Sequence, residues 1–249
     1  PDDYALWSRA LGHVLDLLGR PRGPSHRRDV MLVGAMPLPL ASSGLDRGEE
    51  HNPLLLLSEK GVVIKDETLF ADDQIGNARL QLAYPWVATE ASANCPEGVA
   101  SPDGVFAGLV AKQALAKGAF HSAAGQDPVT VRATVPALDL SDLRNATDRS
   151  DWLGERLALI GPRHGKLTLL SDSTMADSRA WRPGGVSRLM NIVLRAARHM
   201  GQDQMFEPGG PQLWSRLRGQ MERFLDDLAG RGALTSIGGA PSYEVRCDR

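Results

Sequence analysis

Helical stripes alternate along this chain with short, continuous apolar runs, and that alternation limits the folds open to it. Residues 4–18 carry apolar side chains at helical spacing, and Gly19 and Pro21 end the pattern. The next run, at 30–34, is apolar throughout and is stopped by Pro37. A helix followed by an unbroken apolar strand is typical of α/β folds whose sheet is covered by helices.

The middle of the chain continues the pattern around an insertion. Residues 41–79 begin as a polar, Gly-rich stretch and then suit a short hairpin, so we expect a loop or hairpin insertion there. Residues 78–89 alternate as a strand with one buried face. Pro85 cannot donate to a ladder, so it is expected to bend this strand or to place it at an edge.

Residues 101–118 have the sharpest helix boundaries in the sequence. Ser101 suits the N-cap, Pro102 the first helical position, and Gly118 the position after the last turn. Farther along, two short strands are expected around a turn at 161–165. The Gly and Arg residues of that turn could hold a phosphate, but they fit an ordinary turn equally well.

Two amphipathic helices follow. The first, at 186–200, turns three arginines away from its apolar stripe, which predicts a solvated or a protein-docking face: Arg188, Arg195 and Arg198. The second, at 211–229, has a stripe of seven apolar side chains whose burial contributes about 10–20 kcal/mol gross, at about 1.5–3 each. These are Leu213, Trp214, Leu217, Met221, Phe224, Leu225 and Leu228. Trp214 and Phe224 are therefore predicted to be buried.

The sequence ends on a second alternation. Tyr243, Val245 and Cys247 point one way, and the polar residues between them point the other, which is the period of a strand with one wet face. A strand at this position needs a neighbour with which to pair. We expect it to pair within its own sheet and to leave one edge for another molecule.

Composition and charge exclude several classes of function. A formal net charge of −2 gives no electrostatic reason to expect nucleic acid. No apolar run approaches the roughly 20 residues of a membrane span, and no leader pattern opens the chain. Cys95 and Cys247 form neither a disulfide framework nor a metal quartet, and the six histidines contain no His-x-x-x-His pair. We therefore expect no cofactor, no metal, no membrane insertion and reduced thiols.

Catalytic signatures are also missing, with one open alternative. The chain has no Gly-x-Ser-x-Gly elbow, phosphate-binding loop or dinucleotide fingerprint. Ser171, Asp172 and Ser173 follow a strand, where α/β enzymes often place reacting groups, but Ser and Asp are also common turn formers. We predict no catalytic residue and keep a small α/β hydrolase using Ser171 or Asp172 as the alternative. Without catalysis, replacing both by Ala is expected to cost only the stability of a turn.

Several short motifs in the last third occur in a distinctive order. An aromatic-Glu-Pro segment at 206–208 precedes a Leu-Trp pair at 213–214, a Phe-Leu pair at 224–225 and a Gly-Ala-Leu at 232–234. Val-Arg-Cys-Asp at 245–248 closes the series. This order resembles the tail sheath proteins of contractile phage tails and of related contractile injection systems.

The resemblance extends upstream and implies a fold. Tyr-Pro-Trp-Val at 84–87 and the Pro-x-Gly-x-x-Ala-Gly helix start at 102–108 are also similar to the sheath family. It implies an α/β fold over 1–249 as one domain, with a mixed sheet flanked by helices and a sheath-like C-terminal core at 80–248. The chain departs from the family at 169–174, where members carry a Trp-Gly-Ala-Arg-Thr-like strand end, and it shows neither of the family's terminal arms.

The same resemblance implies a structural role rather than an enzyme. Sheath subunits assemble in the cytoplasm into a phage tail or tail-like particle, polymerise around an inner tube, meet a baseplate, and contract to drive the tube through an envelope. Arm strands added to neighbouring sheets tie the subunits together. The expected subunit interface is the terminal strand: Ser242, Tyr243, Glu244, Val245, Arg246, Cys247 and Asp248. The arginine face becomes a possible tube-facing or neighbour-facing surface. A non-contracting sheath-like adaptor or cap is a further alternative, and without arms the chain is expected to be monomeric or weakly associated by itself.

Overall fold

The computed structural model describes residues 6–7, 9–14, 29–36, 76–138, 153–176, 178–235 and 242–247. Contacts divide the chain into two compact units, residues 1–188 and residues 189–249, and each is described separately. The division falls inside helix α6 (Gly184–Asp203), whose first residues belong to the first unit. The single-domain interpretation of 1–249 stays a prediction.

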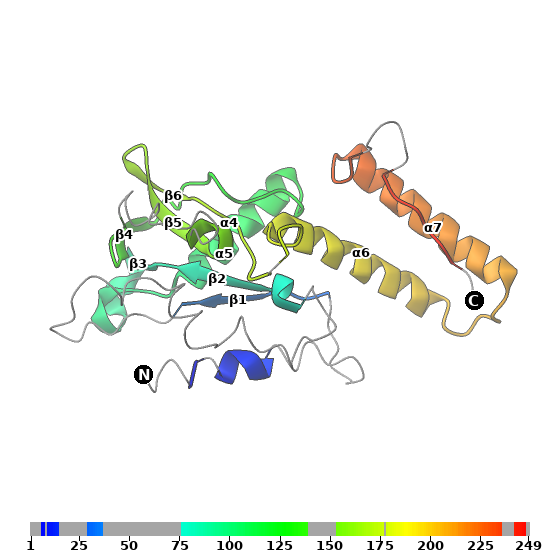
Figure 1. Cartoon of the computed structure of the whole chain (residues 1–249), viewed down its shortest axis with the longest axis horizontal. Coiled ribbons are helices and arrows are strands. Elements are labelled where there is room, and N and C mark those ends of the chain that lie inside the picture. Colours follow the sequence, from blue (N-terminus) through cyan, green and yellow to red (C-terminus); the bar gives the residue numbers. More distant parts are fainter. Residues whose placement is uncertain are drawn as a thin grey trace. The chain divides into compact units, whose positions relative to one another are not determined.

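A mixed four-stranded sheet organises the first unit, as the sequence predicts (Figure 1). Its strands lie in the order β1 (Leu32–Ala35), β2 (Leu80–Tyr84), β5 (Ala158–Arg163) and β6 (Lys166–Leu169). β1 and β5 run parallel to β2, whereas β6 runs antiparallel to β5. The expected strand at 30–34 is thus confirmed with a shift of one or two residues.

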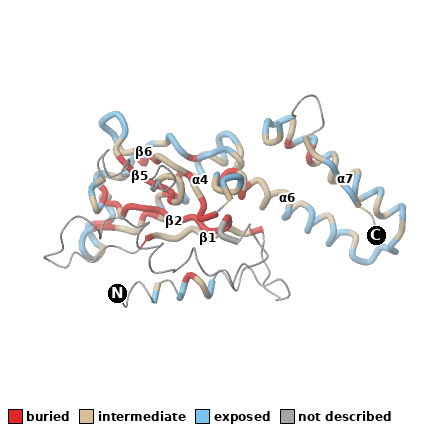
Figure 2. Tube along the Cα trace, viewed as in Figure 1, coloured by how far each residue is buried: buried red, intermediate tan, exposed pale blue. Residues whose placement is uncertain are grey.

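β2 lies at the centre of this sheet and is buried on both faces (Figure 2). Leu80, Leu82 and Tyr84 join a cluster that includes Leu11 from the helical N-terminal residues. Ala83, on the opposite face, joins a cluster built around Phe106 of α4 (Pro102–Lys117), which packs on β1 and β2. Leu80, Leu82 and Tyr84 thus share one face of the strand, as the alternation predicts, and the opposite face is covered as well.

Pro85 divides the 78–89 segment as expected. The Tyr84–Pro85 peptide bond is cis, and β3 (Trp86–Thr89) leaves the main sheet to pair antiparallel with β4 (Val131–Val135). Val87 also bridges Ala100, which ties the start of α4 to β3. Pro85 therefore marks a bend in the chain rather than an edge strand.

The predicted boundaries of α4 are confirmed: Ser101 is the N-cap residue, Pro102 the first helical residue and Gly118 the C-cap with φ +107°. The Ser101 side chain makes no capping hydrogen bond. The turn between β5 and β6 is shorter than expected. Only His164 and Gly165 form it, both with positive φ, and residues 161–163 extend β5.

The second unit contains the rest of α6 and α7 (Pro211–Gly230). The predicted stripe on α7 is confirmed in position, since all seven of its residues are buried or half-buried. Leu225 and Leu228 are the buried pair, while Trp214 and Phe224 are only half-buried. The prediction that both aromatic side chains are buried is therefore met only in part.

Short helices complete the described fold: η1 (Gly76–Arg79), η2 (Ala91–Asn94), η3 (Pro96–Gly98) and α5 (Leu153–Arg156). The expected insertion at 41–79 lies outside the described residues except for η1.

Two substitutions on α4 test the burial pattern. Phe106→Ala is expected to cost about 3–5 kcal/mol of unfolding free energy, because the ring is fully buried between α4 and the sheet. Leu115→Ala, at a side chain that is 90% exposed on the same helix, is expected to change it by less than about 0.5 kcal/mol. Urea unfolding followed by circular dichroism measures both. Similar losses for the two variants would contradict the assigned helix face.

Candidate functional site

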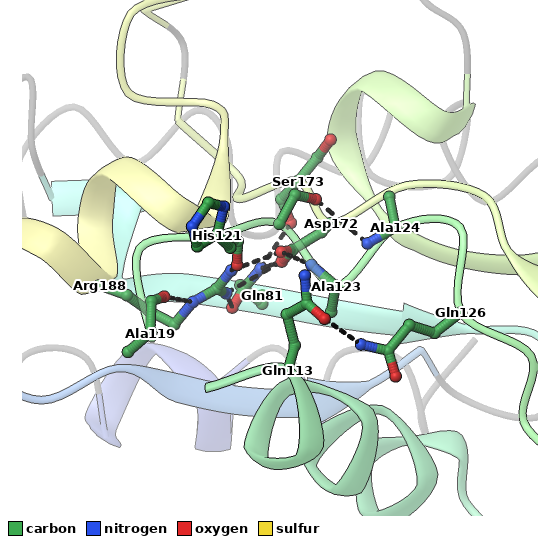
Figure 3. Close-up of polar contacts among 11 residues, drawn as sticks. Gln81, Gln113, Ala119, His121, Ala123, Ala124, Gln126, Asp172, Ser173 and Arg188 are labelled. Carbon is green, nitrogen blue, oxygen red and sulfur yellow. Dashed lines mark hydrogen bonds and ion pairs between the residues drawn. The ribbon is translucent and has the colours of Figure 1, made fainter. Parts of the chain in front are cut away.

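A buried ion pair joins the loop after β6 to the start of α6 (Figure 3). Arg188 faces Asp172 with both terminal nitrogens, Nη1 to Oδ1 at 3.0 Å and Nη2 to Oδ2 at 2.5 Å. The Asp172 side chain has no solvent exposure and that of Arg188 only 10%. A parallel two-bond geometry is the strongest form of an arginine–carboxylate contact.

Every donor of the Arg188 guanidinium has an acceptor. Nε donates to the Ala119 carbonyl at 2.8 Å, and Nη2 also donates to the His121 carbonyl at 3.2 Å. Nη1 has a second, longer contact with Gln81 Oε1 at 3.4 Å. Five N–H groups thus meet acceptors on three separate segments, which offsets much of the cost of removing the charge from water.

The Asp172 carboxylate likewise has hydrogen-bond donors around both of its oxygens. Besides Arg188, Asp172 accepts hydrogen bonds from Gln81 Nε2 at 2.8 Å and from the Ala123 main-chain N–H at 2.9 Å. Gln81 comes from the centre of β2, on the face toward Ala83. The cluster therefore connects the central strand, the segment after α4, the loop after β6 and α6.

Two glycines allow α6 to begin against this cluster. A Cβ on Gly184 would lie 2.5 Å from Asp172 Oδ1, and one on Gly185 would lie 2.3 Å from the Phe120 carbonyl oxygen. The Gly184 N–H, at the first turn of the helix, donates to the Asp172 main-chain oxygen at 2.8 Å. Only residues without a side chain permit so close an approach of the backbone.

The serines beside Asp172 hold the backbone in place. Ser171 Oγ donates to the Leu157 carbonyl at 2.7 Å and accepts from the Leu159 N–H at 3.2 Å. Ser173 Oγ donates to the Gly154 carbonyl at 2.8 Å. A serine nucleophile needs a base within hydrogen-bonding reach of its hydroxyl. The hydroxyls of Ser171 and Ser173 bond to main-chain groups instead, and the carboxylate of Asp172 is paired with Arg188.

The cluster corrects two expectations. Asp172 is not a simple turn former, because its loss would leave a buried guanidinium without an anion. Arg188 does not belong to an exposed basic face, because it points into the first unit. Arg195 and Arg198 are exposed, and their role on a docking face stays a prediction.

The terminal segment differs from the expected strand. The burial of residues 243–247 alternates as in an extended chain. Tyr243, Val245 and Cys247 are half-buried, while Glu244 and Arg246 are exposed. None of the six residues described at 242–247 belongs to a strand or to either sheet. The prediction that this segment pairs within its own sheet is therefore wrong, whereas its use as a subunit interface stays a prediction.

The described part of the chain contains neither a metal-binding cluster nor a helix that could span a membrane. No group of three or more His, Cys, Asp or Glu side chains there is arranged to hold a metal ion. Nor does any helix in those residues have the length and apolarity needed to cross a bilayer.

The sequence contains weak signals for the cluster. A Gln inside the otherwise apolar β2 and a Gly-Gly pair at the start of α6 each indicate a close polar contact. The pairing of Asp172 with Arg188 has no such signal, because sixteen residues separate them and both types are usually exposed.

Solved structures provide the comparison that sequence does not. No protein-family model and no curated protein matches this sequence. A chain in the cryo-EM structure of the anti-feeding prophage (AFP) baseplate matches 93% of this chain with a TM-score of 0.62 and 17% identity. A chain of the AFP helical sheath in its contracted state matches 78% with a TM-score of 0.54 and 18% identity. A chain of the PVC extracellular contractile injection system sheath, also contracted, matches 64% with a TM-score of 0.53 and 22% identity.

These likenesses establish the fold. The mixed α/β fold of this chain is the fold found in those AFP and PVC chains, at low sequence identity. The chain spans 53%, 63% and 43% of the AFP baseplate, AFP sheath and PVC sheath chains, respectively. It therefore corresponds to between about two fifths and two thirds of each.

Breaking the buried pair from one side tests its structural role. Asp172→Asn keeps the shape but removes the anion, and is expected to cost about 3–5 kcal/mol because Arg188 remains buried and charged. Glu222→Gln breaks the exposed Arg218–Glu222 pair and is expected to change stability by less than about 0.5 kcal/mol. Chemical denaturation of both variants is the measurement, and equal effects would refute a special role for the buried pair.

Two glycines of the same helix provide a second test. Gly184→Ala is expected to destabilise the protein, because the new methyl group would collide with Asp172 and Gln81. Gly201→Ala has open space around its Cβ and is expected to stabilise the helix by up to about 1 kcal/mol. Thermal melts of the two variants should shift in opposite directions, and a shared direction would mean that α6 does not start against the cluster.

Proposed function

We propose that this chain is a structural subunit of a contractile tail sheath, which polymerises around an inner tube and contracts to drive that tube through a target envelope. The observation that carries the proposal is the fold match along 93% of the chain to a component of a contractile particle, with further matches to two sheaths. The series of short sequence motifs between residues 206 and 248 supports the proposal independently of the structure.

The proposed partners are further sheath subunits, an inner tube protein and baseplate components, within a phage tail or tail-like particle assembled in the cytoplasm. Docking through 242–248 would add one strand at a time, and each net backbone hydrogen bond contributes only about 1 kcal/mol. One added strand is therefore a tether, and the stability of the polymer comes from its repetition through the lattice.

The proposed role is not catalytic. The Asp172 carboxylate is committed to Arg188, Gln81 and the Ala123 N–H, and the flanking serines are bonded to main chain. These contacts attach the first turn of α6 firmly to the sheet. In a subunit that transmits mechanical load, such an attachment would keep the start of α6 in place.

A second candidate is a sheath-like adaptor at the baseplate that does not contract. It is favoured by one observation, that two of the matching chains come from AFP baseplate structures. The two candidates differ in polymer length: a shaft subunit forms long striated tubes, whereas an adaptor stops at a ring or a short stack.

Co-polymerisation tests both the function and the docking segment. The chain is mixed with a full-length sheath protein and its tube protein, and the products are viewed by electron microscopy and sedimented. Incorporation into striated tubes supports the sheath, and incorporation limited to one end of the tube supports the adaptor. Recovery of the chain entirely in the supernatant would contradict both.

Two proline variants identify the docking edge. Neighbouring residues of an extended segment direct their N–H groups to opposite sides, so Val245→Pro and Arg246→Pro each remove a donor from a different edge. If one edge receives the neighbour, one variant should lose co-polymerisation and the other should retain it, with unchanged melts. Full incorporation of both variants would exclude 242–248 as the docking segment.

A further inference from the structure

The extended residues 243–247 are held by side chains rather than by a ladder. No backbone-to-backbone hydrogen bond is recorded for them within the described part of the chain, and none is assigned to a strand. Their alternating burial nevertheless shows one face turned inward. Something other than a neighbouring strand must keep them extended.

One phenol connects the segment to α7. The Tyr243 hydroxyl lies 3.1 Å from the main-chain oxygen of Glu222 and in hydrogen-bonding contact with the carboxylate of Asp226. Glu222 and Asp226 are one helical turn apart, so their acceptors lie on the same side of α7. The Tyr243 O–H thus has two possible acceptors on the same side of α7. This contact fixes the position of Tyr243, the first residue of the extended segment, against the helix.

A second interaction favours the extended form without reaching α7. Arg246 donates from Nε and Nη2 to the two carboxylate oxygens of Glu244, at 2.7 and 3.1 Å. Residues two apart lie on the same face of an extended chain. This pair is exposed and local, so it contributes little to the attachment of the segment to α7.

We infer that Tyr243 is a positioning residue, which holds residues 243–247 extended on α7 in the free subunit and so presents their main chain to an extended segment of a second sheath-type subunit. The inference rests on the proposed function and adds one property to it: residues 243–247, which would receive the neighbour, are ordered before the neighbour docks. Ordering a flexible segment has an entropic cost, and a surface that is already ordered does not incur it at the moment of binding.

The electrostatics of the phenol agree with this geometry. The hydrogen bond to Asp226 is the main reason that the pKa of Tyr243 is raised from 10.0 to about 12. Because the folded pKa is raised, the attachment is fully present below pH 10 and is lost as the pH rises through about 12. The anchor is therefore intact at every physiological pH.

The first test uses the free chain and NMR relaxation. Tyr243→Phe removes the hydroxyl and keeps the ring, and should shift the equilibrium between attached and released segment by about fivefold to tenfold toward release, the effect of losing one hydrogen bond. The backbone order parameters of 243–247 should therefore fall, whereas Asp227→Asn, which breaks an exposed pair elsewhere on α7, should leave them nearly unchanged. Equal order parameters in Tyr243→Phe and the parent chain would overturn the positioning role.

A spectroscopic readout separates the anchor from general packing. Asp226→Asn keeps an oxygen acceptor but removes the charge, so the pKa of the Tyr243 phenol should fall from about 12 toward 10. The ionisation is followed by NMR of labelled tyrosine, with Tyr243→Phe identifying the signal. An unchanged titration in Asp226→Asn would show that the phenol does not contact this carboxylate, and would overturn the inference.

The second test measures co-polymerisation with a full-length sheath protein. Tyr243→Phe should raise the concentration needed for incorporation by about fivefold to tenfold, and Asp227→Asn, outside the docking segment, should leave it unchanged. Improved incorporation of Tyr243→Phe would overturn the inference, since the contact would then restrain the segment rather than present it. If the parent chain itself fails to incorporate, the proposed function fails, whereas equal order parameters in the free chain contradict only the role of Tyr243.

Discussion

A carboxylate and a guanidinium, both removed from water, hold the first unit of this protein together at the point where α6 begins. Asp172 and Arg188 satisfy each other, and Gln81 with three main-chain groups from residues 119–123 satisfies the rest. Replacing one partner is costly because the other stays buried. The contact thereby fixes the register of four segments that are distant in sequence, and the glycines at the start of α6 follow from it, since any side chain there would displace the cluster.

The two units use different kinds of attachment. In the first, the sheet and its two apolar clusters surround β2, and the polar cluster is enclosed within them. In the second, the terminal residues are attached to α7 through one half-buried phenol. The buried cluster fixes the register of four segments, whereas the phenol restrains a single segment through its hydroxyl. Under the proposed function, the first attachment would keep the body of the subunit rigid and the second would position a segment for a neighbour.

Sequence patterns predicted the elements whose cause is local. The boundaries of α4 follow from Ser101, Pro102 and Gly118, and the stripe on α7 follows from helical spacing. The bend at Pro85 follows from a missing donor. The same kind of pattern failed for residues 242–247, which alternate like a strand without belonging to either sheet. Alternation reports which side chains face inward, but it does not report what the backbone pairs with.

By itself the sequence determined the class of fold, the positions of the long helices and the resemblance to contractile sheaths, because spacing, caps and short ordered motifs are properties of neighbouring residues. The tertiary structure alone decided that Arg188 belongs to a buried cluster and Arg195 to the surface, and that Asp172 is the buried partner of Arg188 rather than a simple turn former. Both arginines carry the same charge and lie on the same helix. What distinguishes them is burial, because the folded arrangement of β2, the loop after β6 and α6 encloses Arg188 opposite Asp172, whereas Arg195 is exposed.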